Sequence, residues 1–490
     1  MTTQLVSARS VATTGVIARA AILWLVAVIV GGIAYFRPKM IVWSVVGPLL
    51  ACAVLTFAFV TFLRWIEDAV PYFEIGVFYA VIVFIYCAFP LLQYIANGYS
   101  FPENADARLI LTQHRPEALG ALSWWYVVYL ACFCVAYVLA RGRRPTVLPL
   151  NVPQSDASTL AAIAILLIGA SAFFAVLGWF YDMSTSSYLE QYLVIQRLPP
   201  FVRQVAAHVR VMSLNLEVML VIALCCARRR RYNLILAAFL AWTVISRVVW
   251  PHARLELFSI LLAAIAAYHL VVRRIPFRWA AAGALTAFIA LLALGPIRAS
   301  RSLQDVRSQM SVQTEFSIIF GNAVDLKYLQ NLSGGFLAKP NLYWSGVLAM
   351  VPQQLMPIAK DTPAEWYARG YYPEYYRTGG GLAFGVLAEA VMGFGIWEVV
   401  WRGALIGALF GLLHRTLGRG RVSLALLMFY LWMIVWCYQT VRTGTFALLM
   451  FVVYHFLTPL LGITVLAAML RRGRRAARSL AAPPRAANPI

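Results

Sequence analysis

Long runs of apolar residues, bounded by charged ones, dominate this chain of 490 residues. Because a helix needs roughly 20 apolar residues to cross a bilayer, each run is long enough to be a membrane span. The runs predict twelve spans, at residues 16–36, 41–63, 73–96, 121–140, 158–181, 211–227, 232–249, 255–272, 279–296, 384–414, 422–439 and 446–470. Only 12% of the residues are charged, whereas about a quarter are in a soluble domain. A soluble enzyme, a disordered chain and a collagen-like chain are excluded, and an all-α polytopic membrane protein is predicted.

Basic residues predict how the chain is oriented. The 41 Lys and Arg outnumber the 19 Asp and Glu, but a soluble nucleic-acid-binding protein could not carry this much apolar surface, so no nucleic acid partner is expected. Five Arg clusters fall on one side of the membrane in this topology: Arg141, Arg143 and Arg144; Arg228 to Arg231; Arg273, Arg274 and Arg278; Arg415, Arg419 and Arg421; Arg471, Arg472, Arg474 and Arg475. Because cytoplasmic loops are enriched in Lys and Arg, that side and both termini are predicted to be cytoplasmic.

The predicted spans divide the chain into four parts: residues 1–296 with spans 1–9 and short loops, 297–383 as a large outer loop, 384–470 with spans 10–12, and 471–490 as a disordered basic tail on anionic lipid. The stretch 384–414 is long for one helix, and Gly393 and Gly395 predict a short helix followed by the true span. The seven cysteines lie in apolar runs without His or acidic partners at ligand spacing. We therefore expect no metal and no cofactor, and interpret the cysteines as packing residues.

The outer side carries more positive charge than the orientation rule allows. Eighteen of the 41 Lys and Arg fall there in this topology, and fourteen of the eighteen are Arg. Arg presents a planar fork suited to phosphate and stays charged when partly buried. Snorkelling to phospholipid headgroups is the alternative for any single Arg. As a set, the outer Arg residues favour a site for anionic lipid-linked groups.

Two segments concentrate these Arg residues. The turn 246–256 holds Arg247, His252, Arg254 and Glu256. Glu256 either pairs with one of these Arg residues or belongs to an anion site, and His252 is either a headgroup contact or a proton-transfer group.

The second segment, 295–307, leaves the ninth span with Arg298 and Arg301 three residues apart. On a helix both would share one face and could grip one diphosphate, unless the stretch simply rests on lipid.

The segment 377–395 combines a charge, a glycine run and a buried acid. It reads Arg377-Thr378-Gly379-Gly380-Gly381, then Glu389, then Phe394-Gly395. Three successive glycines allow close backbone approach to a phosphate or sugar, and no P-loop lysine follows. Glu389 lies in an apolar helix, where an isolated charge is costly. It is therefore either paired structurally with an Arg or has a catalytic or sugar-binding role.

This last motif resembles the bacterial O-antigen or oligosaccharide repeat-unit polymerases of the Wzy type. Members share many spans, a large periplasmic loop late in the chain, and a Thr-Gly-rich exit into a helix with a Glu and then Phe-Gly. Residues 378–395 fit that pattern. Arg254 resembles the family's Gly-x-Arg motif, although Pro251-His252-Ala253 replaces its glycine. The similarity in layout covers most of the chain, and the motif similarity covers about 30 residues.

The resemblance implies a glycosyltransferase with a GT-C-like bundle in the bacterial inner membrane, active at the periplasmic face. Its substrates would be an undecaprenyl-diphosphate-linked glycan donor and acceptor in the membrane lipid, with a chain-length regulator and a flippase as further candidate partners. We expect Arg254 and the other outer Arg residues to bind diphosphate: Arg247, Arg298, Arg301, Arg377 and Arg442. Glu389 or His252 would orient or deprotonate the acceptor hydroxyl. Aromatic residues of the outer loop would stack on sugars or pack the loop onto the bundle: Trp366, Tyr371, Tyr372, Tyr375 and Tyr376.

Three other functions stay open. An O-antigen ligase would use the same donor with a different acceptor. A transporter or flippase of lipid-linked glycans predicts ionisable residues through the membrane; the candidates Glu74, Glu217 and Arg402 form no obvious relay in sequence. A scaffold protein leaves the outer Arg excess unexplained.

Overall fold

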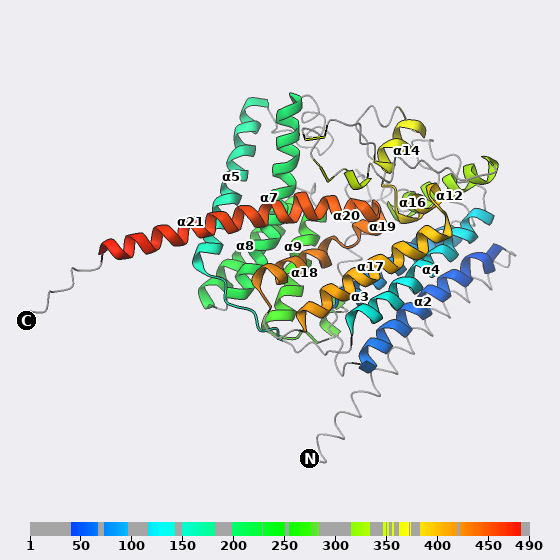
Figure 1. The fold of residues 1–490 in the computed structure, drawn as a ribbon, viewed down its shortest axis with the longest axis horizontal. Coiled ribbons are helices and arrows are strands. Elements are labelled where there is room, and N and C mark those ends of the chain that lie inside the picture. The colour runs from blue at the N-terminus through cyan, green and yellow to red at the C-terminus, as the bar shows by residue number, and fades with distance from the viewer. Residues whose placement is uncertain are drawn as a thin grey trace, which may run out of the picture.

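A computed structural model of the chain (Figure 1) describes these residues: 41–66, 73–96, 116–142, 149–181, 198–227, 229–249, 254–276, 278–280, 282–283, 315–333, 346–348, 350–351, 355–356, 362–371, 373, 383–418 and 422–481. Within them the chain is helical. The principal helices are α2 (Ile41–Ile66), α3 (Ile75–Ala96), α4 (Pro116–Arg141), α5 (Ala157–Tyr181), α7 (Pro200–Ala227), α8 (Arg230–Val249), α9 (Arg254–Ala267), η2 (Tyr268–Val272), α12 (Glu315–Ser333), α14 (Pro363–Tyr371), α16 (Val386–Met392), α17 (Ile396–Leu417), α18 (Leu424–Trp436), α19 (Gln439–Arg442), α20 (Thr445–Phe451), η3 (Val452–Leu457) and α21 (Thr458–Ala481).

The part of the chain that the structure describes holds eight helical segments long and apolar enough to cross a membrane. They are Val45–Arg64, Ile75–Ile95, Ala118–Arg141, Ala157–Tyr181, Phe201–Ala227, Ile396–Leu417, Leu424–Arg442 and Thr445–Arg475. A shorter apolar helix, Glu256–Val272, matches the predicted span 255–272. The chain is thus a polytopic membrane protein that is all-helical in its described part. The predicted span 16–36, most of 279–296 and most of the loop 297–383 lie outside the described residues.

Three parts of the fold differ from a simple series of spans. The stretch 384–414 divides into α16 and α17 at Gly393 and Gly395, as the glycine pair predicts. The tail expected to be disordered from residue 471 instead continues α21 as a helix to Ala481. In the segment 297–383, predicted to be an outer loop, α12 and α14 supply regular structure that the sequence did not reveal.

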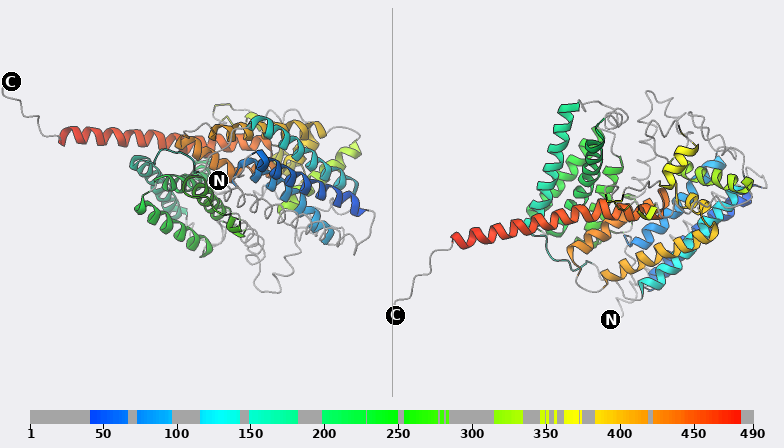
Figure 2. Two further views of the ribbon diagram at one scale, coloured as in Figure 1. Left: turned by 90° about the horizontal axis from the view of Figure 1, so that it is seen from below. Right: turned by 45° about the horizontal axis from the view of Figure 1, so that its top comes forward.

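The helices form two groups (Figures 1 and 2). α2, α3, α4 and α17 lie side by side, with α12 and α16 at one end, while α5, α7, α8, α9 and α21 form the second group. α18 contacts α3 and α17 in the first group and α7 and α9 in the second. α18 is followed by the short helix α19 and then by Thr443 and Gly444, which form the α19–α20 turn. This turn is therefore placed where the two groups meet.

Glycine residues set the closest helix pair, α4 with α17. Gly403, Gly407 and Gly411 repeat every four residues and face α4 along one line. A Cβ at Gly403 would lie 2.6 Å from the Tyr129 carbonyl oxygen, and one at Gly411 would lie 2.6 Å from that of Tyr137. Small residues at this spacing let two helix backbones approach, which stabilises helix pairs where lipid provides no hydrophobic drive.

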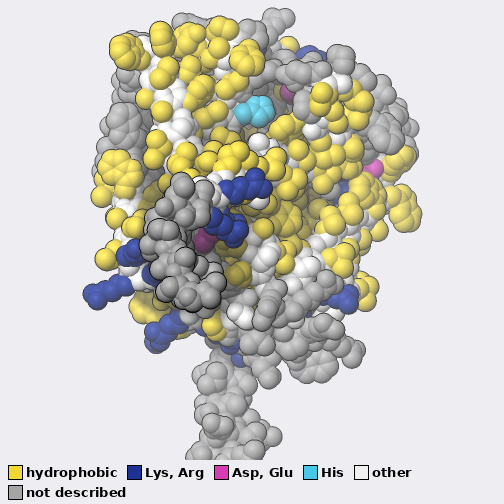
Figure 3. All heavy atoms as spheres, turned by 60° about the vertical axis from the view of Figure 1, so that its left-hand side comes forward, with side chains coloured by type: hydrophobic (Ala, Val, Ile, Leu, Met, Phe, Trp, Pro, Cys, Tyr) yellow, Lys and Arg dark blue, Asp and Glu magenta, His cyan; other side chains and the backbone are white. Residues whose placement is uncertain are grey.

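Segments next to the predicted basic clusters meet at one end of the bundle. The Leu150 N–H donates to Leu270 O (2.7 Å), and the Val422 N–H donates to Asn151 O (3.2 Å). Arg471 pairs with Asp156 at 2.7 Å. In Figure 3, Lys and Arg side chains gather over one part of a largely hydrophobic face. Which side of the membrane this end faces stays a prediction from the distribution of Lys and Arg.

Replacing Gly407 should test the α4–α17 contact. We expect Gly407→Ala to lower stability by about 1–3 kcal/mol, because its methyl group would overlap the Phe133 carbonyl oxygen. Gly169→Ala in α5 is the matched control, since no atom lies within 4 Å of a Cβ there. It should be neutral or slightly stabilising. Thermal unfolding in detergent measures both, and equal effects would contradict the close contact.

Candidate functional site

Glu389 lies on the short helix α16, which glycines delimit on both sides. Gly385 precedes the helix with φ 86° and Gly395 follows it with φ 64°, both conformations that favour glycine. A Cβ at Gly385 would also lie 2.6 Å from the side chain of Ile319 on α12. Gly385 and Gly395 therefore bound a short helical segment that carries one buried acid, while the glycine run 379–381 lies outside the described residues.

A buried ion cluster surrounds Glu389. The Arg402 Nη1 pairs with Glu389 Oε2, and the Arg402 Nε donates to Glu398 Oε2 at 2.7 Å. Their side chains are at most 6% exposed. When all three are ionised, two carboxylates face one guanidinium, so the cluster carries a net charge of −1. A buried charge is stable only when it is paired, so Arg402 accounts for Glu389 in an apolar helix.

The α19–α20 turn completes the cluster. The Thr445 N–H donates to Glu389 Oε2 at 3.0 Å, and Gly444, with φ 127°, lies directly against the carboxylate. Arg442 ends α19 two residues earlier and is partly exposed. The Arg402 guanidinium carbon also lies 4.9 Å from the Trp401 ring centre and 5.1 Å from that of Phe446. Cation–π contacts of this kind stabilise a desolvated guanidinium.

The helix α12 packs over α16 through polar contacts. Asn322 Nδ2 donates to Ala383 O at 2.9 Å, just before α16, and Gln330 Nε2 donates to Val391 O at 3.4 Å. Lys327 Nζ lies 5.3 Å from the ring centre of Trp125, whose indole also faces Gly395. Burial lowers the pKa of Lys327. A part of the predicted outer loop thus sits directly on the Glu389 helix.

The structure describes the side chains of only some of the predicted site residues. Glu389 accepts a hydrogen bond from Thr445, just after the turn that follows Arg442. Trp366 on α14 is partly buried against the hydrophobic core. Arg254 begins α9, Arg247 lies in α8 and Tyr371 ends α14. For these three residues the structure describes the backbone and not the side chain. The remaining candidates also lie outside them: His252, Arg298, Arg301, Arg377, Tyr372, Tyr375 and Tyr376. Glu256 lies 3.9 Å from Arg210 of α7, a residue outside the turn 246–256.

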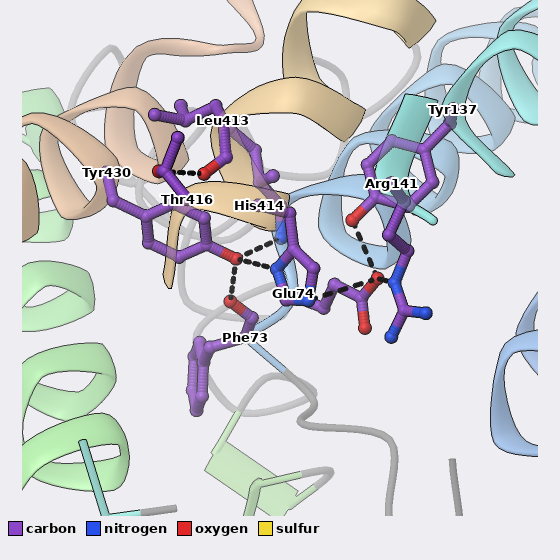
Figure 4. A network of polar contacts seen from close by, with 9 residues as sticks. Phe73, Glu74, Tyr137, Arg141, Leu413, His414, Thr416 and Tyr430 are labelled. Carbon is purple, nitrogen blue, oxygen red and sulfur yellow. Dashed lines mark hydrogen bonds and ion pairs between the residues drawn. The ribbon is translucent and has the colours of Figure 1, made fainter. Parts of the chain in front are cut away.

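Sequence reasoning missed Arg402 and Glu398 as members of this site. Their spacing of four residues within an apolar helix was a usable pattern, because it places both on one helix face. It also missed a second polar network at the other end of α4 and α17 (Figure 4). There Glu74 Oε1 accepts from Tyr137 (2.6 Å) and Arg141 (2.7 Å) and lies 3.8 Å from His414.

Tyr430 ties this second network to α18. Its hydroxyl is 3.0 Å from Nδ1 of His414 and accepts from the Ile75 N–H at 2.9 Å. Arg141, interpreted from sequence as an orientation marker, is in fact only 2% exposed.

Aromatic residues separate the two charged clusters. The Tyr79 hydroxyl is 2.6 Å from those of Tyr129 and Thr440. Its ring centre lies 4.7 Å from Phe133 and 5.2 Å from Phe410. Phe133 is one helical turn from Tyr129 on one side and one turn from Tyr137 on the other, so it lies between the clusters along α4.

No family model matches the chain, and neither the search of curated proteins nor that of solved structures gave a match. The fold and the geometry above define the class: a multi-pass, all-helical membrane protein with buried ion clusters.

The net charge of the Glu389 cluster predicts that substitutions of its members lower the stability of the protein by unequal amounts. Arg402→Gln leaves two buried carboxylates without their guanidinium and should cost about 3–5 kcal/mol of stability. Glu389→Gln leaves the Arg402–Glu398 pair, which is neutral, and should cost less. Thermal unfolding of both variants in one detergent measures the order; a larger loss for Glu389→Gln would contradict the arrangement.

Proposed function

We propose that the chain is a membrane-embedded glycosyltransferase that polymerises undecaprenyl-diphosphate-linked oligosaccharide repeat units. It would work at the periplasmic face of a bacterial inner membrane, with both termini cytoplasmic, as the resemblance to the Wzy-type polymerases implies. The observation that carries the proposal is the ion cluster that joins α16 to the α19–α20 turn, which follows Arg442. A buried Glu–Arg cluster beside a partly exposed Arg, on a Gly-rich motif at a helix break, is typical of a functional site within a membrane protein.

The proposed reaction is a glycosyl transfer. A hydroxyl oxygen of the acceptor sugar attacks the anomeric carbon of the donor glycan, and the bond from that carbon to the diphosphate oxygen breaks. The lipid diphosphate leaves with the electron pair, and the hydroxyl proton passes to a base or to the leaving group. Arg442, with Arg254 and the other outer Arg residues, would neutralise the charge that develops on the diphosphate. No step requires an added nucleotide sugar.

An in vitro assay tests this function. Purified protein in proteoliposomes, given undecaprenyl-diphosphate-linked repeat units without nucleotide sugar or added metal, should produce a ladder of longer glycans. Arg442→Ala should lower the rate by about 10²-fold or more, because it removes a group that stabilises developing charge. Arg471→Ala at the opposite end should leave the rate unchanged. Unaltered substrate with folded, membrane-inserted protein would overturn the proposal.

A cell-based test separates the polymerase from an O-antigen ligase, which uses the same donor. Loss of a polymerase leaves single repeat units on the lipid A core, whereas loss of a ligase leaves none.

The second charged network favours a transporter as the other candidate. Glu74, Arg141 and His414 are buried within or beside candidate spans, as are ionisable groups of proton-coupled transporters. A transporter would move labelled lipid-linked glycan across the vesicle membrane without lengthening it. Ladder formation without translocation would exclude this alternative.

A further inference from the structure

The α19–α20 turn, which follows Arg442, is a very short connection between two candidate spans. The candidate spans Leu424–Arg442 and Thr445–Arg475 are joined by only Thr443 and Gly444. Local hydrogen bonds close the α19 side: the Thr443 N–H donates to Gln439 O at 2.8 Å, and the Gly444 N–H donates to the same oxygen at 3.2 Å. The α20 side begins with Thr445, whose N–H has no partner within its own first turn and is taken by Glu389.

Glu389 is the link between this turn and the rigid part of the fold. Its Oε2 receives both the Thr445 N–H and the Arg402 guanidinium. Arg402 stands next to Gly403, the first residue of the close contact with α4, and Glu398 fixes its Nε. A side chain at Gly444 would overlap Glu389 Oε1, so the glycine permits the approach. The contacts therefore run from α4 and α17 through Arg402 and Glu389 to the turn.

We infer that Glu389 is a positioning residue: with Arg402 it clamps the α19–α20 turn so that Arg442 is held toward the phosphate oxygens of a lipid-linked substrate. In this role Glu389 accepts the Thr445 N–H and takes no proton from the acceptor sugar. The ligand part of the inference rests on the proposed function, whereas the clamp itself does not.

Two substitutions at one position isolate the clamp. Thr445→Pro removes the N–H that Glu389 accepts; proline fits the first position of a helix, and the ψ of 161° at Gly444 suits a residue before proline. Thr445→Val keeps the N–H and is the matched control, because the Thr445 hydroxyl has no hydrogen-bond partner within the described part of the chain.

The rate of thiol labelling at position 442 measures the clamp without any need for activity. In an Arg442→Cys background, corrected for labelling of the native cysteines, Thr445→Pro and Glu389→Leu, which removes the acceptor, should speed modification by a charged thiol reagent roughly tenfold, because the turn opens locally more often. Thr445→Val should not. Glu74→Gln breaks an equally buried ion pair at the other end of α4 and should lower thermal stability without changing the rate at 442. Equal rates in all variants would overturn the inference.

Inorganic pyrophosphate tests the ligand part. It should raise the thermal unfolding temperature of the wild type, and this shift should be lost in Arg442→Gln and reduced in Thr445→Pro but kept in Thr445→Val. Altered labelling without any pyrophosphate shift would leave the clamp standing and overturn its role toward phosphate. A wild type that makes glycan ladders while labelling stays unchanged would overturn the clamp and leave the proposed function intact. A pyrophosphate shift kept in full by Thr445→Pro would show that Arg442 binds without the clamp.

Discussion

The contact between α4 and α17 is the constraint on which the rest of the described fold depends. Three glycines at four-residue spacing bring the two backbones close enough that no side chain can stand between them. Lipid chains are as apolar as the helix surfaces, so burial alone gives membrane helices little reason to associate. Close backbone packing supplies the missing attraction and fixes the relative register of the two helices. Every polar residue on them then has a defined position, including Arg402 on α17 and Tyr137 on α4.

Fixed register explains why charged residues can be buried at both ends of this pair. Arg402 meets Glu389 and Glu398 at one end, and Arg141 meets Glu74 at the other. A mispaired charge in such surroundings would cost several kcal/mol, so these clusters are tolerable only where geometry guarantees their partners. The clusters add little net stability over apolar packing, but they specify which helices are neighbours. They tie α16 and the α19–α20 turn to one end of the pair, and α3 and α18 to the other.

The sequence predicted what depends on local pattern and missed what depends on distant partners. Apolar runs located most of the described spans, and Gly393 with Gly395 located the break before α17, because length and glycine act locally. The partner of Glu389 lies 13 residues away, and that of Glu74 lies 67 residues away, so no periodicity reveals it. Arg141 ends an apolar run, which predicts a loop charge, although the fold turns its side chain inward. The spacing of Gly403, Gly407 and Gly411 is a local pattern of small residues that the sequence does show. The extension of α21 to Ala481 was missed because Arg and Ala form helices as readily as they form polar tails.

The aromatic layer around Tyr79, Phe133 and Phe410 has a consequence for the membrane as an insulator. Chains of hydroxyls and charges that reach from both faces toward the middle of a helix bundle are potential conductors of protons. Here the rings of Phe133 and Phe410 stand between the two, and they offer no group that can hand a proton on. The bundle can thus hold ionised groups at both ends of α4 and α17 with a layer between them that offers no path for protons.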